Sequence, residues 1–443
     1  MPSKKVHSFS PSRTVLYSIA LTIIIGTLLL ALPLARTRPL PLIDLFFTAT
    51  SCTTVTGLMT VPMDSFTPFG MAIIMLLIQI GGLGLVTLSL FVVSLFVNLG
   101  LATQVMAGEM LDLDCWKNAR KIIVFIISLT LIIEAIGAAL IFQSIRHEFS
   151  LSKALFYSVF HSISAFCNAG ITIFNDGMLH YTNNHILILT TALLMFLGGL
   201  GFITWRELTA KWNPFTFKKH HLSLQTKIIL WYYTIFIIGN AFLFFLLESH
   251  NAFEDMSLPT QLTNALFTSV SARSGGYTTV FPTDLQHASL FNLLINAFIG
   301  SAPGSTGSGI KLTTFAIFLG TINAAILHKN SVDINGRRIM KDQVFKAIAV
   351  VALSGMWVIV TTFLLLLTEQ SADFFSIFFE TVSAFATLGT SLGLTPYLSI
   401  TGKCLIMLSM LIGRIGSLTL IIALRKHYDI SDFTYPEERV MIT

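Results

Sequence analysis

Four short segments of the chain run from apolar and aromatic residues into small residues and end in glycine. Their last glycines are Gly57, Gly170, Gly276 and Gly389, so successive segments lie 113, 106 and 113 residues apart. Glycine tolerates the backbone dihedrals that a carbonyl-exposing strand needs, and a ring of backbone carbonyls can replace the hydration shell of a cation. Four such segments in one chain predict a cation-binding ring built from backbone.

A single segment of this kind could equally be an ordinary extracellular loop between two helices. Four copies in register favour a pore instead. Each segment is too brief to cross a bilayer, and backbone that enters and returns at membrane depth is tolerated only where protein or a water-filled cavity surrounds it. The preceding half-helices would also point their partly negative C-terminal ends at the pore.

The composition places these segments in a membrane protein. The chain has 443 residues, of which 54% are hydrophobic and 11% charged, and its mean hydropathy is +0.77. A transmembrane helix takes about 20 apolar residues, and we predict eight such spans. They are Val15–Leu34, Phe69–Val97, Ile122–Phe142, Ile186–Phe202, Ile228–Leu247, Leu290–Leu327, Ala347–Leu367 and Cys404–Leu424. The first has no cleavage site after its apolar run and is expected to be a retained helix.

The predicted fold is an all-α polytopic membrane protein in which four helix–pore loop–helix repeats, with eight transmembrane helices and four re-entrant half-helices, surround one pore. The repeats are expected at residues 1–100 (pore loop 41–61), 101–206 (pore loop 151–174), 207–328 (pore loop 259–280, second helix broken at 300–311) and 329–425 (pore loop 373–392), followed by a cytoplasmic tail at 426–443.

Charge predicts the orientation. Most of the 27 lysines and arginines fall in the N-terminus, in the loops that follow every second span and in the C-terminal tail. The positive-inside rule then places both termini in the cytoplasm. The net charge of +5 reports this orientation and indicates no nucleic-acid role. Four scattered cysteines show neither metal-site nor disulfide spacing.

The sixth span is long and is interrupted by a run of small residues. This run comprises Gly300, Ser301, Ala302, Pro303, Gly304, Ser305, Thr306, Gly307, Ser308, Gly309, Ile310 and Lys311. Proline and four glycines oppose helix formation, so the run should be irregular backbone facing a cavity. We interpret it as a gating loop below the ring; the alternative is a simple kink or a surface loop. Only this span is expected to be broken.

Arg414 lies halfway along the last span, where an unpaired charge is costly. It should therefore face the pore or the interior of the helix bundle. One interpretation is a basic residue at the gate; the other is a structural ion pair, for which Glu134 in the third span is a candidate partner. Lys311 and Arg273 carry the same ambiguity.

The set of motifs resembles a known family. The motifs are Thr53-Thr54-Val55-Thr56-Gly57-Leu58, Asn168-Ala169-Gly170, Arg273 to Gly276, the glycine-serine-threonine run in the sixth span and Gly413-Arg414-Ile415-Gly416. Together they are similar to the Trk/Ktr/HKT superfamily, and most of all to its KtrB-type membrane subunit, over nearly the whole chain.

The resemblance implies a potassium uptake subunit of the bacterial cytoplasmic (inner) membrane, with K⁺ at Gly57, Gly170, Gly276 and Gly389. The selectivity filter would comprise Thr54, Val55, Thr56, Gly57, Cys167, Asn168, Ala169, Gly170, Ser274, Gly275, Gly276, Thr387, Leu388 and Gly389. Members with four filter glycines favour potassium, whereas a serine in the first repeat goes with sodium. In the third repeat Gly276 is preferred to Gly275, because Phe267 and Arg273 then keep their expected offsets.

The resemblance also implies the partners. It predicts a homodimer in the lipid membrane and a separate cytosolic ring of nucleotide-binding RCK/KTN-type, KtrA-like regulatory subunits. No cofactor is expected on this chain, which carries no GxGxxG fingerprint; K⁺ is the transported ion and Na⁺ a candidate activator.

Two other classes of function were weighed. A secondary transporter of sodium or a small organic solute also uses repeats and broken helices, but it would normally pair two broken spans. A membrane enzyme needs convergent catalytic groups, and the chain has no HExxH motif and no paired intramembrane aspartates. We therefore expect no enzymatic activity.

Overall fold

The computed structural model describes residues 11–84, 119–174, 177–211, 221–417 and 438. It is almost entirely helical, with one two-stranded hairpin in the described part. The end of the second predicted span (85–97), the end of the last one (418–424) and the tail at 426–443, apart from residue 438, lie outside the described residues.

The helices form four successive sets. The first contains α1 (Pro11–Leu30), α2 (Leu42–Thr54) and α3 (Pro68–Leu83); the second α6 (Ala119–Ile145), α7 (Leu151–Phe166), α8 (His185–Gly199) and α9 (Phe202–Lys211); the third α10 (Leu224–Glu248), α11 (Leu258–Ser271), α12 (His287–Ile299) and α13 (Leu312–Ile326); the fourth α14 (Lys341–Thr368), α15 (Phe374–Ala386) and α16 (Ile400–Ile415). In each set a long first helix is followed by a short helix (α2, α7, α11 or α15) and then by a second helix (α3, α8, α12 or α16).

The short helices cannot span a bilayer. At about 1.5 Å per residue, the 13 residues of α2 and of α15 reach about 20 Å, against a hydrocarbon core of about 30 Å. Three described helices are both long and apolar enough to cross: Ile123–Ile145 within α6, Leu224–Glu248 and Lys341–Thr368. The short helices are therefore re-entrant, and the long ones frame them.

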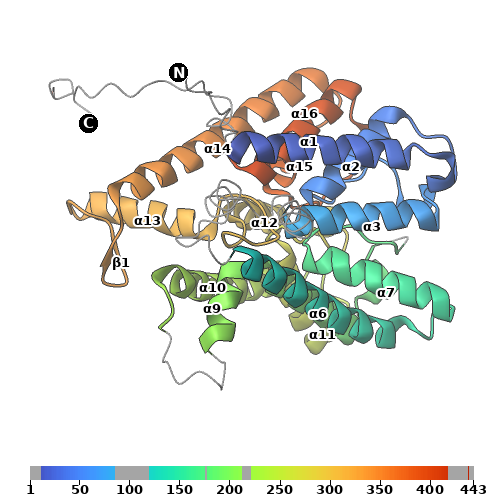
Figure 1. Cartoon of the computed structure of the whole chain (residues 1–443), viewed down its shortest axis with the longest axis horizontal. Coiled ribbons are helices and arrows are strands. Elements are labelled where there is room, and N and C mark those ends of the chain that lie inside the picture. Colours follow the sequence, from blue (N-terminus) through green and yellow to red (C-terminus); the bar gives the residue numbers. More distant parts are fainter. Residues whose placement is uncertain (1–10, 85–118, 175–176, 212–220, 418–437, 439–443) are drawn as a thin grey trace, which may run out of the picture.

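The four sets of helices form a closed circle. The second helix of each set packs on the short helix of the next: α3 on α7, α8 on α11, α12 on α15 and, completing the circle, α16 on α2. In Figure 1 the first set (blue) accordingly lies beside the last (red) although they are far apart in the sequence. This circle of sets places the ends of all four short helices around one axis.

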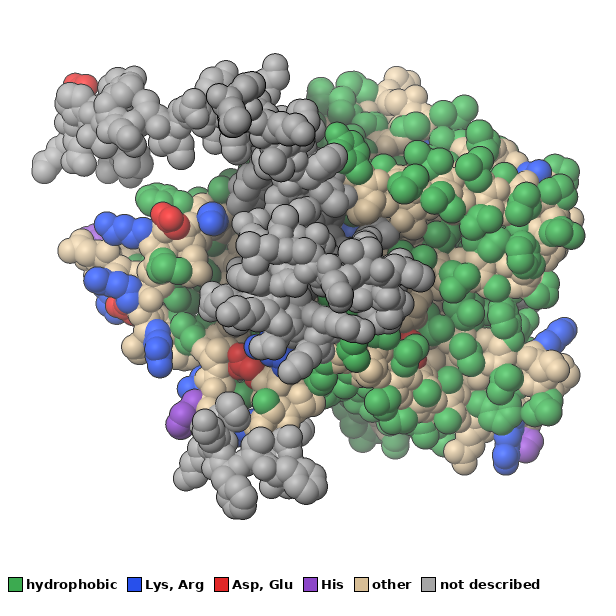
Figure 2. Space-filling view, in the orientation of Figure 1, with side chains coloured by type: hydrophobic (Ala, Val, Ile, Leu, Met, Phe, Trp, Pro, Cys, Tyr) green, Lys and Arg blue, Asp and Glu red, His purple; other side chains and the backbone are tan. Residues whose placement is uncertain are grey.

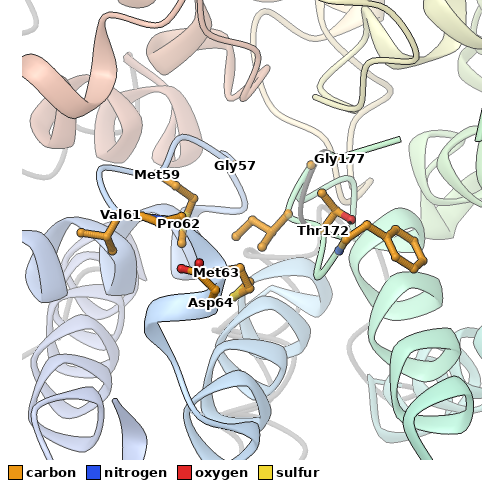
Figure 3. Close-up of a pocket in the computed structure, with 11 residues that line it drawn as sticks. Gly57, Met59, Val61, Pro62, Met63, Asp64, Thr172 and Gly177 are labelled. Carbon is orange, nitrogen blue, oxygen red and sulfur yellow. Dashed lines mark hydrogen bonds between the residues drawn. The ribbon is translucent and has the colours of Figure 1, made fainter. Parts of the chain in front are cut away.

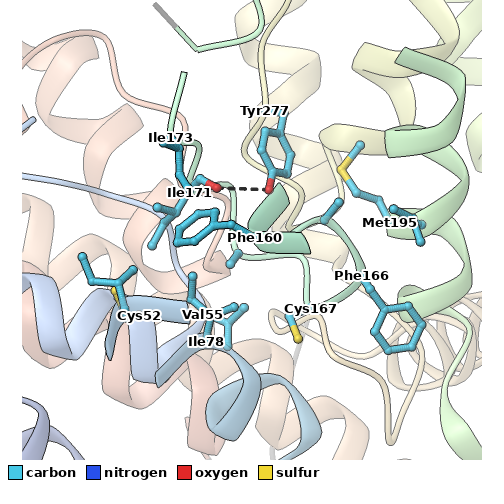
Figure 4. Packing of buried hydrophobic residues seen from close by; sticks show 14 of the residues in the cluster. Cys52, Val55, Ile78, Phe160, Phe166, Cys167, Ile171, Ile173, Met195 and Tyr277 are labelled. Carbon is cyan, nitrogen blue, oxygen red and sulfur yellow. Dashed lines mark hydrogen bonds between the residues drawn. The ribbon is translucent and has the colours of Figure 1, made fainter. Parts of the chain in front are cut away.

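Apolar side chains cover much of the outside as well as the inside. Figure 2 shows hydrophobic residues spread over the right-hand part of the molecule, and Leu28, Phe242 and Ile359 are 63%, 63% and 69% exposed. A water-soluble surface rarely carries so much contiguous apolar area. The inner cluster joins the first two sets: Val55 and Ile78 lie near Phe160 in Figure 4. This is the arrangement of a polytopic membrane protein.

The described helices break at two places. The sixth span breaks as predicted, because α12 ends at Ile299 and α13 begins at Leu312. A second break was not expected: α8 and α9 meet at an angle of 95°, where the fourth predicted span (Ile186–Phe202) ends. The bend occurs at Gly201, whose φ of 84° a helix cannot accommodate.

Candidate functional site

The four segment glycines share one backbone conformation. Gly57, Gly170, Gly276 and Gly389 have φ values of 101°, 67°, 73° and 88°. Two positions before each glycine stands a residue that is also left-handed: Val55 (57°), Asn168 (59°), Ser274 (64°) and Thr387 (50°). Gly275 is not among the glycines with positive φ. The backbone therefore pairs Gly276, rather than Gly275, with the other three.

These glycines approach one another so closely that no side chain fits between them. A Cβ atom built on Gly57 would lie 3.2 Å from the Cα of Gly389, and one on Gly170 would lie 3.0 Å from the Cα of Gly276. A Cβ on Gly276 would lie 3.4 Å from the Cα of Gly389 and would also meet the Leu388 carbonyl. A Cβ on Gly57 would also meet the carbonyl of Ala169, next to Gly170, so the four segments form a closed ring of backbone.

The C-terminal ends of the short helices point toward this ring. α2, α7, α11 and α15 end three to five residues before the ring glycines. The C-terminal end of a helix carries a partial negative charge. Four such ends around a backbone ring make a site that favours a cation and disfavours an anion.

A serine near the end of each short helix holds the segment that follows. The Oγ atoms of Ser164, Ser271 and Ser383 each donate to a carbonyl just beyond the ring glycine, all at 2.6 Å. The amides of Gly57 and Gly389 donate to the Oγ atoms of Ser51 and Ser383, at 3.0 and 3.2 Å. Sequence analysis missed these serines, although three of the four recur six residues before the glycine.

Glycines on the second helices allow close packing against the short helices. A Cβ on Gly81, Gly198 or Gly413 would collide with the carbonyl of Thr53, Phe166 or Phe385, respectively. Each of these carbonyls lies four residues before a ring glycine. The backbones of α3, α8 and α16 therefore contact the ends of the short helices α2, α7 and α15 directly.

A pocket of about 250 Å³ opens above the ring on the side of the first two sets. Gly57 and Gly170 lie in its lining, and Asp64 supplies a carboxylate. Figure 3 shows Met59, Met63 and Asp64 across from Thr172. An ion approaching the ring from this side would pass a negative charge.

The predicted gating loop, residues 300–311, is buried behind the ring. Ser301, Thr306 and Ser308 are at most 1% exposed. The amides of Ala302 and Thr306 donate to the carbonyls of Gly199 and Gly198, both at 3.2 Å. The loop is thus hydrogen-bonded to the bend between α8 and α9 and is neither a surface loop nor a simple kink.

The same loop is bonded to the ring segments. The Nδ2 of Asn168 donates to the Oγ1 of Thr306 at 2.7 Å, and the amide of Ser308 donates to the Oγ of Ser274 at 3.3 Å. The Ser274 hydroxyl in turn donates to the Ala386 carbonyl at 3.0 Å. The second and third ring segments are therefore bonded to the loop, and the fourth is linked to it through Ser274.

Two cations fix the loop. Arg414 donates through Nη1 to the Thr306 carbonyl and, at 3.2 Å, to the Ser308 hydroxyl, and through Nη2 to the Gly81 carbonyl. Lys311 donates through Nζ to the Gly307 carbonyl at 2.8 Å. Within the described residues no carboxylate forms an ion pair with Arg414, so the alternative of a structural pair with Glu134 is wrong.

Arg273 occupies a different environment. It is 1% exposed, and its guanidinium carbon lies 5.0 Å from the ring centroid of Tyr233 and 4.8 Å from that of Phe236. None of its guanidinium nitrogens has a hydrogen-bond partner in the described part of the chain. It therefore ties the third ring segment to α10 by cation–π contacts.

Comparison with known proteins agrees with this geometry. A family described as cation transport protein, TrkH, matches residues 10–433. The Ktr system potassium uptake protein B of Vibrio alginolyticus is 37% identical, with 97% of this chain and 94% of that protein covered. The protein of the same description from Bacillus subtilis is 36% identical, with 98% and 96% covered.

A third relative and a solved structure extend the comparison. The potassium/sodium uptake protein NtpJ of Enterococcus hirae is 32% identical, with 98% of this chain and 97% of that protein covered. The crystal structure of the potassium transporter TrkH from Vibrio parahaemolyticus has the same fold, with a TM-score of 0.74 at 19% identity, covering 96% of this chain and 87% of that one. The chain belongs to the TrkH family of cation transport proteins.

Proposed function

We propose that the chain is the pore-forming subunit of a Ktr-type potassium uptake system. The observation that carries the proposal is the closed ring of four positive-φ glycines, with the ends of four short helices behind it. Two relatives that match nearly the whole chain are described as Ktr system potassium uptake proteins. K⁺ is the transported ion, and Na⁺ is a candidate activator; the Enterococcus relative is named a potassium/sodium uptake protein.

In this proposal the selectivity filter is made of backbone carbonyls. They come from residues 54–57, 167–170, 274–276 and 387–389, with K⁺ held at the level of the four glycines. The close approach of the glycine Cα atoms supports this choice, because a side chain at any of the four positions would narrow or distort the ring. Carbonyl oxygens at such a ring replace the water that K⁺ loses.

The buried loop is proposed as the gate. Arg414 ties the loop to α3, and Lys311 braces it from within. Separate hydrogen bonds join the loop to the ring segments and to the α8–α9 bend. Opening requires these bonds to break, so the loop as described is a closed barrier. The interaction that breaks these hydrogen bonds would come from a partner outside this chain.

The partners and the placement in the cell are also proposals. The relatives' names speak of a Ktr system, which supports a cytosolic nucleotide-binding ring of regulatory subunits and a homodimer of this chain. The four repeats, bounded near residues 100, 206 and 328, would sit in the bacterial inner membrane with both termini in the cytoplasm.

One observation favours a second candidate, a secondary transporter that works by alternating access. Such transporters pair two broken spans, and the α8–α9 bend adds a second break to the one between α12 and α13. The two breaks are hydrogen-bonded to each other through Gly199 and Ala302. The four-glycine ring has no role in that mechanism, which is why we prefer the pore.

Growth and uptake distinguish the two candidates. The chain is expressed, with and without a candidate regulatory ring subunit, in cells that lack their own high-affinity potassium uptake. The proposal expects growth at low potassium and potassium accumulation that depends on the ring subunit. Accumulation of another solute without potassium, with the chain demonstrably in the membrane, would instead favour alternating access.

A further inference from the structure

A basic pocket lies at the end of the molecule remote from the ring. It opens where α13 leads through the hairpin of β1 (Asp333–Ile334) and β2 (Arg337–Arg338) into α14. In Figure 1 this is the left-hand end, where the hairpin projects. The pocket has a volume of about 550 Å³ and is a separate cavity from the one above the ring.

The charge of this pocket has one sign. Lys329, Arg338 and Lys341 lie in its lining, and none of the described lining residues is acidic. The acidic residues of the same elements are Asp333, which accepts a hydrogen bond from Ser331 at 3.2 Å, and Asp342, and neither is part of the lining. Figure 2 shows lysine and arginine side chains gathered at this end. The pocket is built for an anion.

Its surroundings are apolar. Ala324, Val332 and Ile339, which belong to its lining, form a buried apolar cluster. Phe345, which belongs to the lining, is 69% exposed, and Ile326, the last residue of α13, is 71% exposed. A soluble anion needs only the three cations and gains nothing from these apolar side chains. A ligand that uses both must carry an anionic head and apolar chains.

We propose that this pocket binds the phosphate headgroup of an anionic phospholipid, whose acyl chains lie along the exposed apolar faces of α13 and α14. Basic pockets between membrane helices attract such headgroups, and each lysine or arginine near the surface contributes about fivefold in affinity. α13 begins directly after the buried loop. The lipid would therefore join the helix that carries the loop to the long helix α14.

The test measures lipid binding by the full chain, purified in detergent, by native mass spectrometry. The probes are dioleoylphosphatidylglycerol, dioleoylphosphatidylcholine and inorganic phosphate. The pocket variant carries Lys329→Gln, Arg338→Gln and Lys341→Gln. The control variant carries Lys227→Gln, Arg337→Gln and Lys346→Gln, three exposed cations outside the lining, with the same change of net charge.

We expect the wild-type chain to prefer phosphatidylglycerol to phosphatidylcholine, and the pocket variant to bind phosphatidylglycerol on the order of 100-fold more weakly. The control variant should bind it as wild type does. Unchanged phosphatidylcholine binding and an unchanged elution volume show that each variant is folded.

Three results would overturn the proposal. An equal loss in both variants would mean that net charge alone attracts the lipid. Displacement of phosphatidylglycerol by millimolar phosphate would identify a free anion as the ligand. No preference between the two lipids, with the chain forming dimers that the pocket variant abolishes, would show that a second copy of the chain covers this face.

Discussion

Arg414 illustrates how a buried charge can be satisfied without a counter-ion. Its guanidinium is bonded to two backbone carbonyls and a hydroxyl, from the buried loop and from α3. The sequence shows that a charge in the middle of a span needs partners, but it cannot show which ones. Partners 108 and 333 residues away are set by the ring closure and not by local pattern.

Replacing Arg414 by alanine should release the loop. A hydrogen bond from a charged group is worth about 1.5–3 kcal/mol, so losing even one should raise potassium flux without the regulator by about tenfold or more. The potassium flux of Arg414→Lys should lie between those of the wild type and Arg414→Ala, because a single ammonium group cannot reproduce the forked hydrogen bonds of the guanidinium group. The measurement is potassium flux into proteoliposomes, with Lys227→Ala as control. Reduced flux from a folded Arg414→Ala variant would mean that this arginine supports conduction.

Ser383 holds the fourth ring segment through two hydrogen bonds, from Gly389 and to the Thr390 carbonyl. Ser383→Ala should therefore loosen the filter and reduce discrimination of K⁺ from Na⁺ by roughly tenfold, since each neutral hydrogen bond is worth about 1 kcal/mol. Ion competition in uptake assays measures this effect. The control is Ser371→Ala, at an exposed serine. Equal selectivity in both variants would show that Ser383 does not contribute to ion discrimination.

At the scale of elements, the α8–α9 bend is the feature that sequence reasoning missed. The predicted span Ile186–Phe202 stops at the bend, because hydropathy marks the end of the apolar run but does not register the change of direction into α9. Gly201, with φ of 84°, and Gly304, whose carbonyl accepts from the Phe202 amide at 2.9 Å, join the bend to the buried loop. The prediction of a broken sixth span succeeded because proline and glycine act locally.

Gly201→Ala tests this coupling between α9 and the loop. A residue with a side chain is strained at positive φ by about 1–2 kcal/mol, and its Cβ would lie 2.6 Å from the Pro303 carbonyl. The displaced loop should change resting potassium flux severalfold. Gly239→Ala in α10, where nothing lies within 4 Å of the new atom, is the matched control. Wild-type potassium flux in the Gly201→Ala variant would show that α9 is not coupled to the gating loop.

At the scale of the whole molecule, the first and last sets are held together by an ion pair as well as by packing. Lys403 of α16 lies 2.7 Å from the carboxylate of Asp44 in the first turn of α2, and both side chains are nearly buried, at 12% and 9% exposed. The aspartate also faces the positive end of its helix. This pair closes the circle of four sets.

Breaking the pair should destabilise the ring. Asp44→Asn and Lys403→Gln should each lower the free energy of unfolding by about 1–3 kcal/mol, and the double variant should lose less than the sum. Thermal unfolding in detergent, followed at two salt concentrations, gives these values. Additive losses would show that the two side chains do not act as a pair.

The fold was predictable because its pattern is repeated. Four glycine segments at nearly constant spacing indicated the ring, and apolar runs indicated the spans. The contacts that hold the ring could not be predicted, because Ser274 reaches Ala386 and Lys403 reaches Asp44 across separate sets. Arg273 is a further case: its charge was visible, but its stacking on Tyr233 and Phe236 depends on how α10 packs.

The ion selectivity of the four-glycine ring is the central claim, and one measurement tests it most directly: K⁺ against Na⁺ uptake into proteoliposomes by the wild-type chain, Gly276→Ser and Gly393→Ser. Gly393 also has positive φ (94°), but nothing lies within 4 Å of an added Cβ, so it controls for backbone strain. The account predicts a preference for K⁺ in wild type and Gly393→Ser that falls at least about tenfold in Gly276→Ser, where the new Cβ would lie 3.1 Å from the Cα of Gly170. Equal selectivity in folded Gly276→Ser and Gly393→Ser, or no preference in wild type, would contradict it.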